Sequence, residues 1–339
     1  MKSTFTYMKK HIWILMVSAL GCTSSIDQNA DNIADAVDPV ADHTLTSDQT
    51  HNKWSRTIEP VLSINSGEVV EISTAEATDG QLTIDSDTSD LMNLSFEPIH
   101  PLTGPIYVNE AQPGDVIAVT LHKIEIGDWG WTAILPGFGF LADEYTEPHL
   151  KTFELAGKNN VRFADGINIP LKPFPGVLGV APDTDSLLST IPPRANGGNM
   201  DDPNIVEGTT VYLPVFVEGA LFSIGDAHAA QGLGEVCGTA IEAPMKFLVE
   251  IELLKGVSIK EPQYENDDVY AVTAYATTLD EAAKKATRYM IDYLKNNHGL
   301  SGNDAYMLCS LAGDLKIAEV VDVPHMLVTM SINKEVLNK

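Results

Sequence analysis

Residues 225–242 read GDAHAAQGLGEVCGTAIE, a stretch that holds three acids, a histidine, a glutamine, a cysteine and four glycines. Most of these residue types add little to an apolar core, so their density in one short segment is typical of a functional site. The segment lies between two runs with the composition of β-strands, residues 220–224 and 245–253. The sequence therefore predicts a site at the end of a strand in a β-rich fold.

The run that follows this segment has the clearest strand pattern. In residues 245–253, apolar side chains alternate with Lys246, Glu250 and Glu252, with Leu248 as the exception. Alternation with a period of two gives a strand one apolar and one polar face. We expect this strand to cover the core with one face and to contact water with the other.

Three further regions repeat one arrangement of strands. In each, two runs rich in β-branched or aromatic residues are separated by a turn that contains glycine. Such regularly spaced runs indicate the strands of a sandwich or barrel. The three regions are residues 60–72, 105–121 and 210–224.

Helical patterns are clear only near the C-terminus. Thr278 and Glu281 form a capping box, apolar residues then repeat at intervals of three and four, and Gly299 ends the helix. Ser301 with Asp304 begins a shorter helix. The expected flanking strands are residues 269–275, 319–323 and 326–332. The predicted fold class is mainly β, sandwich-like or barrel-like, with a smaller α+β unit at the C-terminus.

The first residues resemble an export signal rather than part of the fold. Two lysines precede a short apolar run that ends before Cys22, and this run is too short to span a bilayer. We expect residues 1–21 to be a lipoprotein signal peptide and Cys22 to be acylated, which would anchor the protein in the cell envelope, facing the periplasm or the cell surface. Ala19 departs from the leucine usual at its position. Secretion without a lipid, or a start at Met8, are the alternatives.

Composition divides the rest of the chain into three parts. A segment with many aspartates and no aromatic residue cannot bury enough apolar area to offset its ordering entropy, so it is expected to be disordered. The parts are an acidic disordered tether (residues 22–47), a β-rich catalytic body (48–255) and the α+β unit that completes the fold (256–339).

The charge balance excludes one class of partner. The formal charge is −26, and cleavage before Cys22 removes three lysines and no acid, which makes it −29. Such a charge repels a phosphate backbone, so nucleic acid is not an expected partner. With Cys22 lipidated, Cys237 and Cys309 remain, and we expect both to be free thiols.

Asp226 and His228 are the strongest candidates for metal ligands. Residues i and i+2 of a strand point to the same face, so a carboxylate and an imidazole would project together from the end of one strand. This pair suits a first-row divalent ion such as zinc. The alternative is an aspartate that only orients the histidine. The glycine-bearing turn and Glu235, which follow, favour the metal site.

Glu235 and Cys237 are candidates for the reacting groups. Glycines at 232 and 234 allow close approach of the backbone to a ligand, and Glu235 is our candidate general base for a metal-bound water. It could instead stabilise its own loop by accepting backbone N–H groups. Cys237 is a rival nucleophile if a base lies within reach, or else a buried core residue.

Other segments supply weaker candidates. Asn199 and Asp201 are spaced to point together, as an amide-binding group and an oxygen ligand, although an ordinary turn after prolines explains them equally. His100 is a candidate ligand or a turn residue, and His51 is a weaker member of the same set. The segments 129–131 and 136–139 could form the wall of a pocket for a small, poorly charged substrate, or part of the core.

These segments together resemble the acetamidase/formamidase family over roughly residues 45 to 335. The resemblance is most specific at residues 225–242, and the other segments occur in the family's order: residues 51–54, 100–108, 129–131, 136–139, 173–182, 197–201, 279–283 and 314–317. The resemblance implies hydrolysis of formamide, acetamide or a similar short linear amide to ammonia and a carboxylic acid. It also implies a mostly β fold with a bound divalent metal.

We therefore predict one set of site residues. The catalytic residues are Glu235 and Asp226; the metal ligands are His228, Asp226, Asp201 and His100; the substrate-binding residues are Asn199, Gln231 and Cys237. Zinc is the expected metal, with calcium as a candidate second, structural ion. The expected assembly is a homodimer.

Two residues depart from the family's pattern. Leu233 stands where an acid is usual in the family, and Asn196 stands where histidine is frequent. These departures keep two alternatives open beside metal-dependent hydrolysis. One is a non-catalytic surface lipoprotein that binds a small ligand or a glycan in the inherited pocket, and the other is an amidase with Cys237 as its nucleophile.

Overall fold

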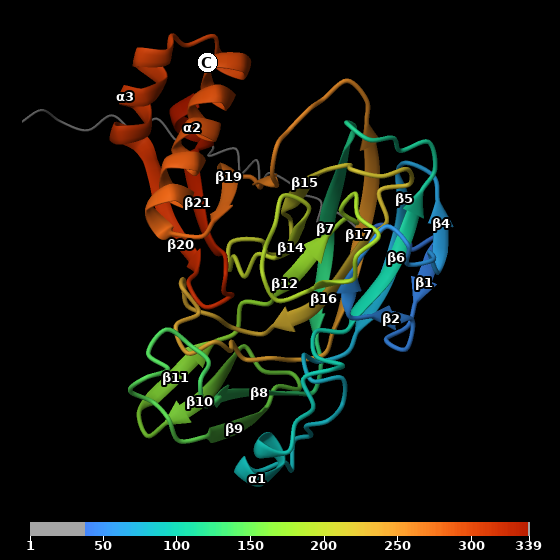
Figure 1. Cartoon of the computed structure of the whole chain (residues 1–339), viewed down its shortest axis with the longest axis vertical. Coiled ribbons are helices and arrows are strands. Elements are labelled where there is room, and N and C mark those ends of the chain that lie inside the picture. Colours follow the sequence, from blue (N-terminus) through green and yellow to red (C-terminus); the bar gives the residue numbers. More distant parts are fainter. Residues whose placement is uncertain (1–37, 338–339) are drawn as a thin grey trace, which may run out of the picture. The chain divides into compact units, whose positions relative to one another are not determined.

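Two large sheets form the body of the protein, a computed structural model that describes residues 38–337 (Figure 1). The nine-stranded sheet has the order β1 (His43–Leu45), β5 (Glu68–Thr74), β17 (Met245–Leu254), β7 (Val116–Ile126), β15 (Thr210–Pro214), β18 (Gln263–Glu265), β19 (Val269–Ala276), β21 (Met326–Asn333) and β20 (Gly313–Glu319). The six-stranded sheet has the order β14 (Gly197–Asn199), β12 (Phe174–Gly179), β16 (Phe222–His228), β6 (Leu102–Val108) and β2 (Thr50–His51), and β4 (Leu62–Ile64) pairs with β6. The prediction of a mainly β fold is confirmed.

Smaller elements surround these sheets. The two-stranded sheets are β8 (Trp129–Ile134) with β9 (His149–Glu154), β10 (Asn160–Ala164) with β11 (Ile167–Pro170), and β3 (Lys53–Trp54) with β13 (Leu188–Ser189). The helices are α1 (Thr88–Met92), α2 (Leu279–His298), α3 (Gly302–Ala312) and α4 (Lys334–Leu337). Among residues 38–337, no helix has the length and apolar character needed to span a bilayer.

The main apolar core lies between the two large sheets. Ile72 and Phe247 from the nine-stranded sheet are fully buried in one cluster with Ile106, Leu178 and Phe222 from the six-stranded sheet. Side chains of two facing sheets interdigitate in this way in a β-sandwich. Truncation of a buried phenylalanine such as Phe247 to alanine costs about 3–5 kcal/mol in cores of this kind.

The three glycine-bearing turns found in the sequence connect one sheet to the other. β4 lies in the six-stranded sheet and is followed by β5 in the nine-stranded sheet, β6 is followed in the same way by β7, and β15 returns the chain to β16. None of these consecutive strands pair with each other. Each of these turns therefore connects the two sheets of the sandwich, and the last one leads into β16, the strand that carries Asp226 and His228.

The strand at residues 245–253 and both helix starts follow the sequence patterns. In β17, Phe247, Val249 and Ile251 are buried, whereas the charged residues between them are half-buried or exposed. The side chain of Thr278 accepts a hydrogen bond from the N–H of Glu281 at the start of α2, and Ser301 does the same for α3. Figure 1 shows α2 and α3 beside β19, β20 and β21, where their apolar residues form a second core cluster.

Three expectations about the chain's organisation need correction. Residues 319–323 are not a strand, because β20 lies earlier, at Gly313–Glu319, and residues 320–325 form a turn. The folded part begins before residue 47, since β1 pairs in parallel with β5. No boundary falls at residue 255, because the nine-stranded sheet continues from β17 to β20 and the chain from Asp38 onward forms one unit. The expected signal peptide and Cys22 lie outside the described residues.

Candidate functional site

The ends of neighbouring strands in the six-stranded sheet bring the predicted site residues together. Asp226 and His228 end β16, Asn199 ends β14, and Asp201 follows Asn199 by two residues. β12 lies between these two strands, and β6, which begins after His100, pairs with the other side of β16. Strand order in the sheet thus explains why side chains far apart in the sequence meet.

Gly176 on β12 is what allows the two strand ends to approach each other. A Cβ atom at this position would lie 2.5 Å from Oδ1 of Asp201 and 2.7 Å from Cε1 of His228. Both distances are shorter than real Cβ contacts, so any side chain here would displace the two site residues. The N–H groups of Met200 and Asp201 donate to the carbonyl of Gly176, which holds the segment in place.

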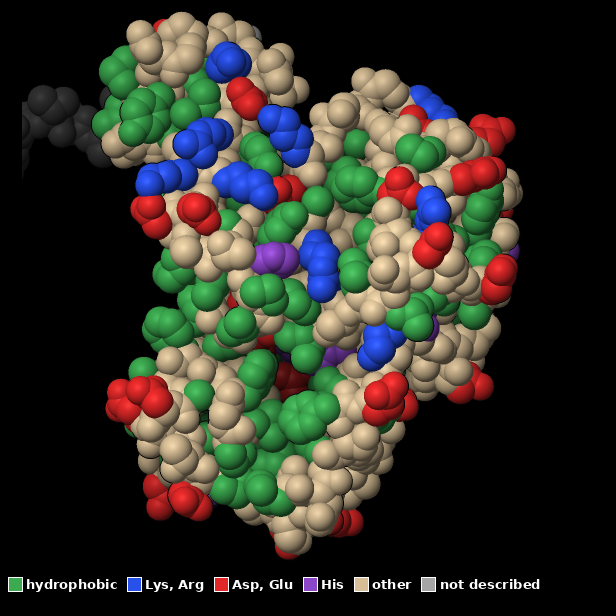
Figure 2. Space-filling view, in the orientation of Figure 1, with side chains coloured by type: hydrophobic (Ala, Val, Ile, Leu, Met, Phe, Trp, Pro, Cys, Tyr) green, Lys and Arg blue, Asp and Glu red, His purple; other side chains and the backbone are tan. Residues whose placement is uncertain are grey.

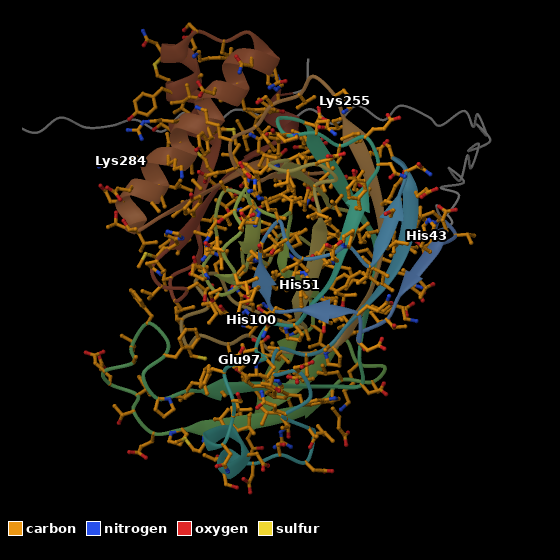
Figure 3. All side chains as sticks on the ribbon, turned by 45° about the vertical axis from the view of Figure 1, so that its right-hand side comes forward. His43, His51, Glu97, His100, Lys255 and Lys284 are labelled. Atoms are coloured by element: carbon orange, nitrogen blue, oxygen red, sulfur yellow. The ribbon has the colours of Figure 1, made fainter. Side chains whose placement is uncertain are left out.

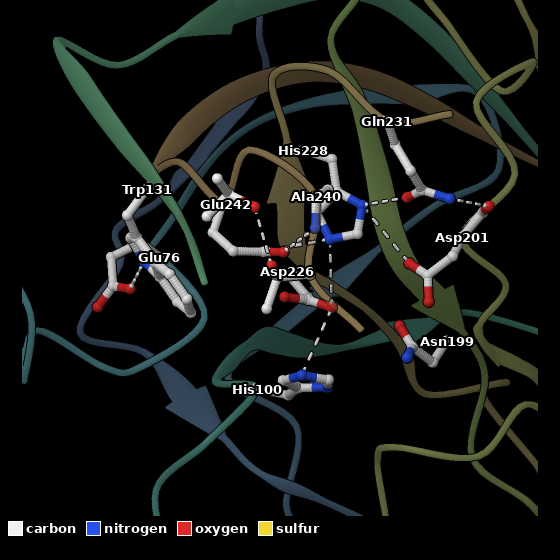
Figure 4. A network of polar contacts seen from close by, with 12 residues as sticks. Glu76, His100, Trp131, Asn199, Asp201, Asp226, His228, Gln231, Ala240 and Glu242 are labelled. Atoms are coloured by element: carbon white, nitrogen blue, oxygen red, sulfur yellow. Dashed lines mark hydrogen bonds and ion pairs between the residues drawn. The ribbon is translucent and has the colours of Figure 1, made fainter. Parts of the chain in front are cut away.

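His228 is the centre of a buried network of charged side chains (Figure 4). Its Nε2 lies 3.1 Å from Oε2 of Glu242 and 3.6 Å from Oδ2 of Asp226, and its Nδ1 lies 3.6 Å from Oδ1 of Asp201. His100 Nε2 lies 3.7 Å from the same oxygen of Asp226. The four predicted metal ligands therefore lie together.

Gln231 fixes the orientation of the His228 ring. Its side-chain NH2 donates to the carbonyl of Asp201 at 2.8 Å, so its oxygen faces Nδ1 of His228, also at 2.8 Å. Nδ1–H of His228 therefore donates to Gln231, and Nε2 is turned toward Asp226 and Glu242. Gln231 does not line the cavity bordered by these acids, so the geometry favours a positioning role over the substrate-binding role that we expected.

We expect Gln231→Ala to lower kcat/KM and the affinity for the metal by about 10- to 100-fold, because the ring of His228 loses its fixed orientation. Steady-state kinetics and metal titration of the chelated protein measure the two effects. Gln112→Ala, at an exposed glutamine without a side-chain hydrogen bond among the described residues, is the control. Unchanged metal affinity in Gln231→Ala would contradict this role.

Glu235 enters the site on a loop that is closed at both ends. The backbones of residues 228–230 and 241–243 pair through hydrogen bonds such as that from the N–H of Ala229 to the carbonyl of Ile241. Within the loop, Gly234 donates to the carbonyl of Ala318 and accepts from the N–H of Val320. Glu235 is 7% exposed as a result, and it borders both this site and a second cavity.

The site contains three acids to which we assigned no role from the sequence. Glu242 lies in the first stretch quoted and pairs with His228, and Asp322 accepts a hydrogen bond from Nδ2 of Asn199 at 2.7 Å. Glu319 accepts from the N–H groups of residues 321 and 322. The contact of the 234 loop with the end of β20 brings the last two acids here, and no local sequence signal indicates that contact.

Backbone strain is concentrated at this site. Eight non-glycine residues in the described part of the chain have positive φ, and four of them are site residues: His100, Asp201, Asp226 and Glu235. Side chains with a Cβ occupy this region at a cost, and such residues cluster where function requires a fixed side-chain direction. The strain supports a functional role for these four residues.

Burial changes the ionisation of the carboxyl groups. It raises the pKa of Asp201, Glu235 and Asp322, that of Glu242 to about 7, and that of Glu319 to about 8. Burial also acts on Asp226, but the charges of His100 and His228 overcome it and lower its pKa to about 2. Burial lowers the pKa of His228, yet Glu242 and Asp226 together raise it well above its ordinary value.

The residues present fit a divalent cation. Three sets have ligand atoms within 4.8 Å of one another: Asp201, Asp226 and His228; His228, Glu235 and Glu242; Asp201, Glu235 and Asp322. Both side-chain oxygens of Asp201 and one oxygen each of Asp226 and Glu242 are buried without a hydrogen-bond partner in the described structure. Buried polar atoms are rarely left in this way, so a cation bound here would satisfy them.

A cavity of about 280 Å³ gives access to these groups. The polar residues on its wall include His100, Asn199, Asp201, Asp226 and Glu235. Most of the apolar wall comes from the loops at 94–99 and 135–138, together with Trp131. Figure 2 shows such a hollow, with acidic and histidine side chains at its bottom and hydrophobic side chains around it.

Two other candidates lie away from this cavity. Cys237 is exposed, not buried, and among the described residues its Sγ hydrogen-bonds only to Ala133 and Thr239. It borders the second cavity, so neither a substrate-binding nor a nucleophilic role in the first cavity is supported. His51 bonds to Ser223 Oγ at 2.8 Å and to the carbonyl of Lys53, and Figure 3 shows it on a segment beside that of His100.

The two departures from the family's pattern do not disrupt the cluster. Leu233 is 47% exposed and borders the second cavity, so the acid usual at this position would also lie outside the first. Asn196 is buried and donates to the carbonyl of Val180. The convergence of carboxylates on His228 thus does not depend on either position.

Comparison with known proteins identifies the family of this chain. The model of the Acetamidase/Formamidase family matches residues 36–189 and 184–339. A putative formamidase of Schizosaccharomyces pombe is 29% identical over 367 residues, which cover 84% of this chain and 89% of that protein. Solved structures of a predicted acetamidase/formamidase from Thermoanaerobacter tengcongensis and of an acetamidase from Bacillus halodurans superpose with TM-scores of 0.82 each, at 34% and 33% identity, and cover 87% of this chain and 96% and 98% of theirs.

The fold and the site together define an amidohydrolase that acts on carbon–nitrogen bonds other than peptide bonds. The chain belongs to the acetamidase/formamidase family, as the match over nearly its whole described length shows.

Proposed function

We propose that this protein hydrolyses a small linear amide to ammonia and a carboxylic acid with the help of a divalent metal ion. The observation that carries the proposal is the convergence of five carboxylates and His100 on one small cavity, with His228 in contact with three of these acids and several buried oxygens left without hydrogen-bond partners. Buried charges in such numbers need a cation or protons to balance them. A purely structural role would leave them paired instead.

Asp201, Asp226 and His228 would hold the metal, with His100 beside Asp226 as a fourth ligand. The imidazole favours zinc, which we propose as the catalytic ion, and the carboxylate-rich set with Asp322 also suits a harder second ion such as calcium. When bound, the ion polarises the amide carbonyl and lowers the pKa of the attacking water.

Glu235 is the proposed general base. It accepts a proton from water as the oxygen adds to the carbonyl carbon, and it returns a proton to the nitrogen as the C–N bond breaks, so that ammonia and the carboxylic acid leave. Oδ1 of Asn199 borders the cavity without a hydrogen-bond partner, because its amide group donates to Asp322. It would accept a hydrogen bond from the substrate's NH2 group and thereby orient the amide.

The direct test is ammonia release from formamide and acetamide by the mature protein before and after chelation. We expect turnover that is lost with the metal and restored by adding zinc. Turnover that survives complete removal of metal would contradict the metal-dependent mechanism. Binding of amides without any ammonia release would instead support a non-catalytic binding protein.

The metal-free protein should become less stable as the pH rises from about 5 to 8. Glu242 and Glu319 have raised pKa values, about 7 and 8, so the folded state keeps protons that the unfolded chain has released, and their contribution to stability is lost as pH passes these values. The raised pKa of His228 acts in the same direction above its unfolded value. The lowered pKa of Asp226, about 2, has no effect over this range.

Thermal melts of the chelated protein across this range measure the effect. Added zinc should raise Tm more at pH 8 than at pH 5, because metal binding displaces the protons. A Tm of the chelated protein that stays constant or rises with pH would contradict this account.

We also propose that the enzyme is exported and lipid-anchored through Cys22, on the basis of its N-terminal sequence. Expression of Cys22→Ala should move the protein from the membrane fraction to the soluble fraction without changing its specific activity. Equal distribution of both variants would contradict lipid anchoring.

A further inference from the structure

The cavity has more space and more apolar wall than formamide or acetamide can use. Its volume is about 280 Å³, near the lower limit of the roughly 300–1,000 Å³ typical of sites for much larger ligands. Acetamide has only a methyl group beyond its amide. Most of the cavity would therefore remain unoccupied around such a substrate.

The polar and apolar walls come from different parts of the fold. The acids and His100 lie at the strand ends of the six-stranded sheet, on the segment between β16 and β17 and on the turn after β20. Ala77, Leu94, Trp131 and Leu135 belong instead to a separate hydrophobic cluster built on β8 and the loops near it. A molecule in the cavity thus meets charged groups from one part of the fold and apolar groups from another.

The apolar wall is held rigidly. Nε1 of Trp131 donates to Oε2 of Glu76 at 2.8 Å (Figure 4). The same carboxylate accepts from the N–H and hydroxyl of Thr78 and from the N–H of Gly80. The loop before His100 is tied by a hydrogen bond from Asn52 to the carbonyl of Glu97, and His100 N–H donates to the carbonyl of Ala77 at 2.9 Å. Because Trp131 is fixed in this way, it loses little conformational freedom when an apolar group binds against it.

No residue on the cavity wall is a lysine or an arginine, within the described part of the chain. A negatively charged acyl group would meet five carboxylates there, and the apolar wall offers it no cation. This excludes amides of dicarboxylic acids and favours neutral ones.

We propose that the substrate is a neutral primary amide whose acyl group is apolar and longer than acetyl. The amide group lies at the carboxylates, and the acyl chain lies against Trp131, Leu135 and Phe138. This inference rests on the proposed function, since it assigns the acyl-binding part of the same site.

A series of unbranched amides tests this proposal. From acetamide to hexanamide, kcat/KM should rise by up to about fourfold for each methylene that is buried, and by at least about tenfold across the series. Adipamic acid, which has the same chain with a terminal carboxylate, should react at least about tenfold more slowly than hexanamide. A kcat/KM that is constant or falls beyond acetamide would overturn the proposal while leaving amide hydrolysis intact.

A substitution in the apolar wall tests where the acyl chain binds. Leu135 is only partly buried, so Leu135→Trp can be accommodated while it fills the apolar part. We expect the ratio of kcat/KM for hexanamide to kcat/KM for acetamide to fall at least about tenfold. Leu187→Trp, at a 64% exposed leucine outside the cavity, is the matched control and should leave both within about twofold. Equal losses on both amides in Leu135→Trp would contradict the assignment.

Binding measurements test this inference independently of the proposed function. If no amide releases ammonia, the proposed hydrolysis fails. Titration calorimetry of the metal-loaded protein with acetamide and hexanamide still shows whether the cavity prefers the longer acyl group. Hexanamide should bind at least about tenfold more tightly. Equal or weaker binding of hexanamide would overturn the inference whatever the outcome for catalysis.

Discussion

Glu235→Gln should lower kcat/KM on a hydrolysed amide by at least about a hundredfold, because positioned general bases contribute about 10²- to 10⁴-fold. The substitution keeps the shape of the side chain and removes its capacity to accept a proton. Burial raises the pKa of Glu235, so a neutral amide at this position should not destabilise the metal-free protein. Ammonia release, Tm and bound metal are measured on the same preparation.

The metal content distinguishes a base from a ligand. Glu235 is near enough to His228 and Glu242 to bind a cation with them, so a variant that loses both metal and activity would contradict its assignment as the base. Glu147→Gln, at an exposed glutamate, is the control for the chemical change. Cys237→Ala should keep full activity, and a loss there with normal metal content would favour the thiol mechanism instead.

Local patterns in the sequence predicted those strands and helices that depend on residues close to them in the chain. The alternation in residues 245–253 and the capping by Thr278 and Ser301 act within a few residues, and the structure has these elements as expected. The prediction of a strand at residues 319–323 was wrong. The valines of this segment resemble a strand, but the chain turns after β20 because the N–H of Val320 donates to the carbonyl of Gly234 and the next two N–H groups donate to the side chain of Glu319.

The candidate site was predictable where its residues share a strand end. Asp226 and His228 are two residues apart, so their proximity follows from strand geometry, and Asn199 and Asp201 were singled out by the same spacing. Asp322 was not, because it reaches the site through the contact of the chain after β20 with Gly234 and through its hydrogen bond from Asn199, 123 residues away. Long-range pairing of this kind leaves no pattern within a short window.

Asp201 and Asp202 are adjacent, fully buried carboxylates with opposite surroundings. Neither oxygen of Asp201 has a hydrogen-bond partner in the described structure. Oδ2 of Asp202 accepts from the hydroxyls of Tyr264 and Thr329, and its Oδ1 accepts from Asn204. The protein therefore supplies hydrogen-bond donors to Asp202, whereas the oxygens of Asp201 remain available to a ligand.

This contrast predicts opposite effects of the same substitution on stability. In the chelated protein, Asp201→Asn should raise the free energy of unfolding by about 1–3 kcal/mol, since it removes a buried carboxyl group whose oxygens accept no hydrogen bond. Asp202→Asn should lower it by a similar amount, because it places an NH2 group opposite two hydroxyl donors. In the metal-loaded protein, Asp201→Asn is expected to be the more damaging of the two substitutions. Asp201→Asn should lose at least about a hundredfold in metal affinity, more than the roughly 10- to 100-fold typical when only a supporting residue is removed, and activity with it. Asp202→Asn should keep its metal affinity.

Urea unfolding and metal titration of both variants measure these four quantities. Destabilisation of the chelated protein by Asp201→Asn would show that Asp201 is a structural residue rather than a ligand.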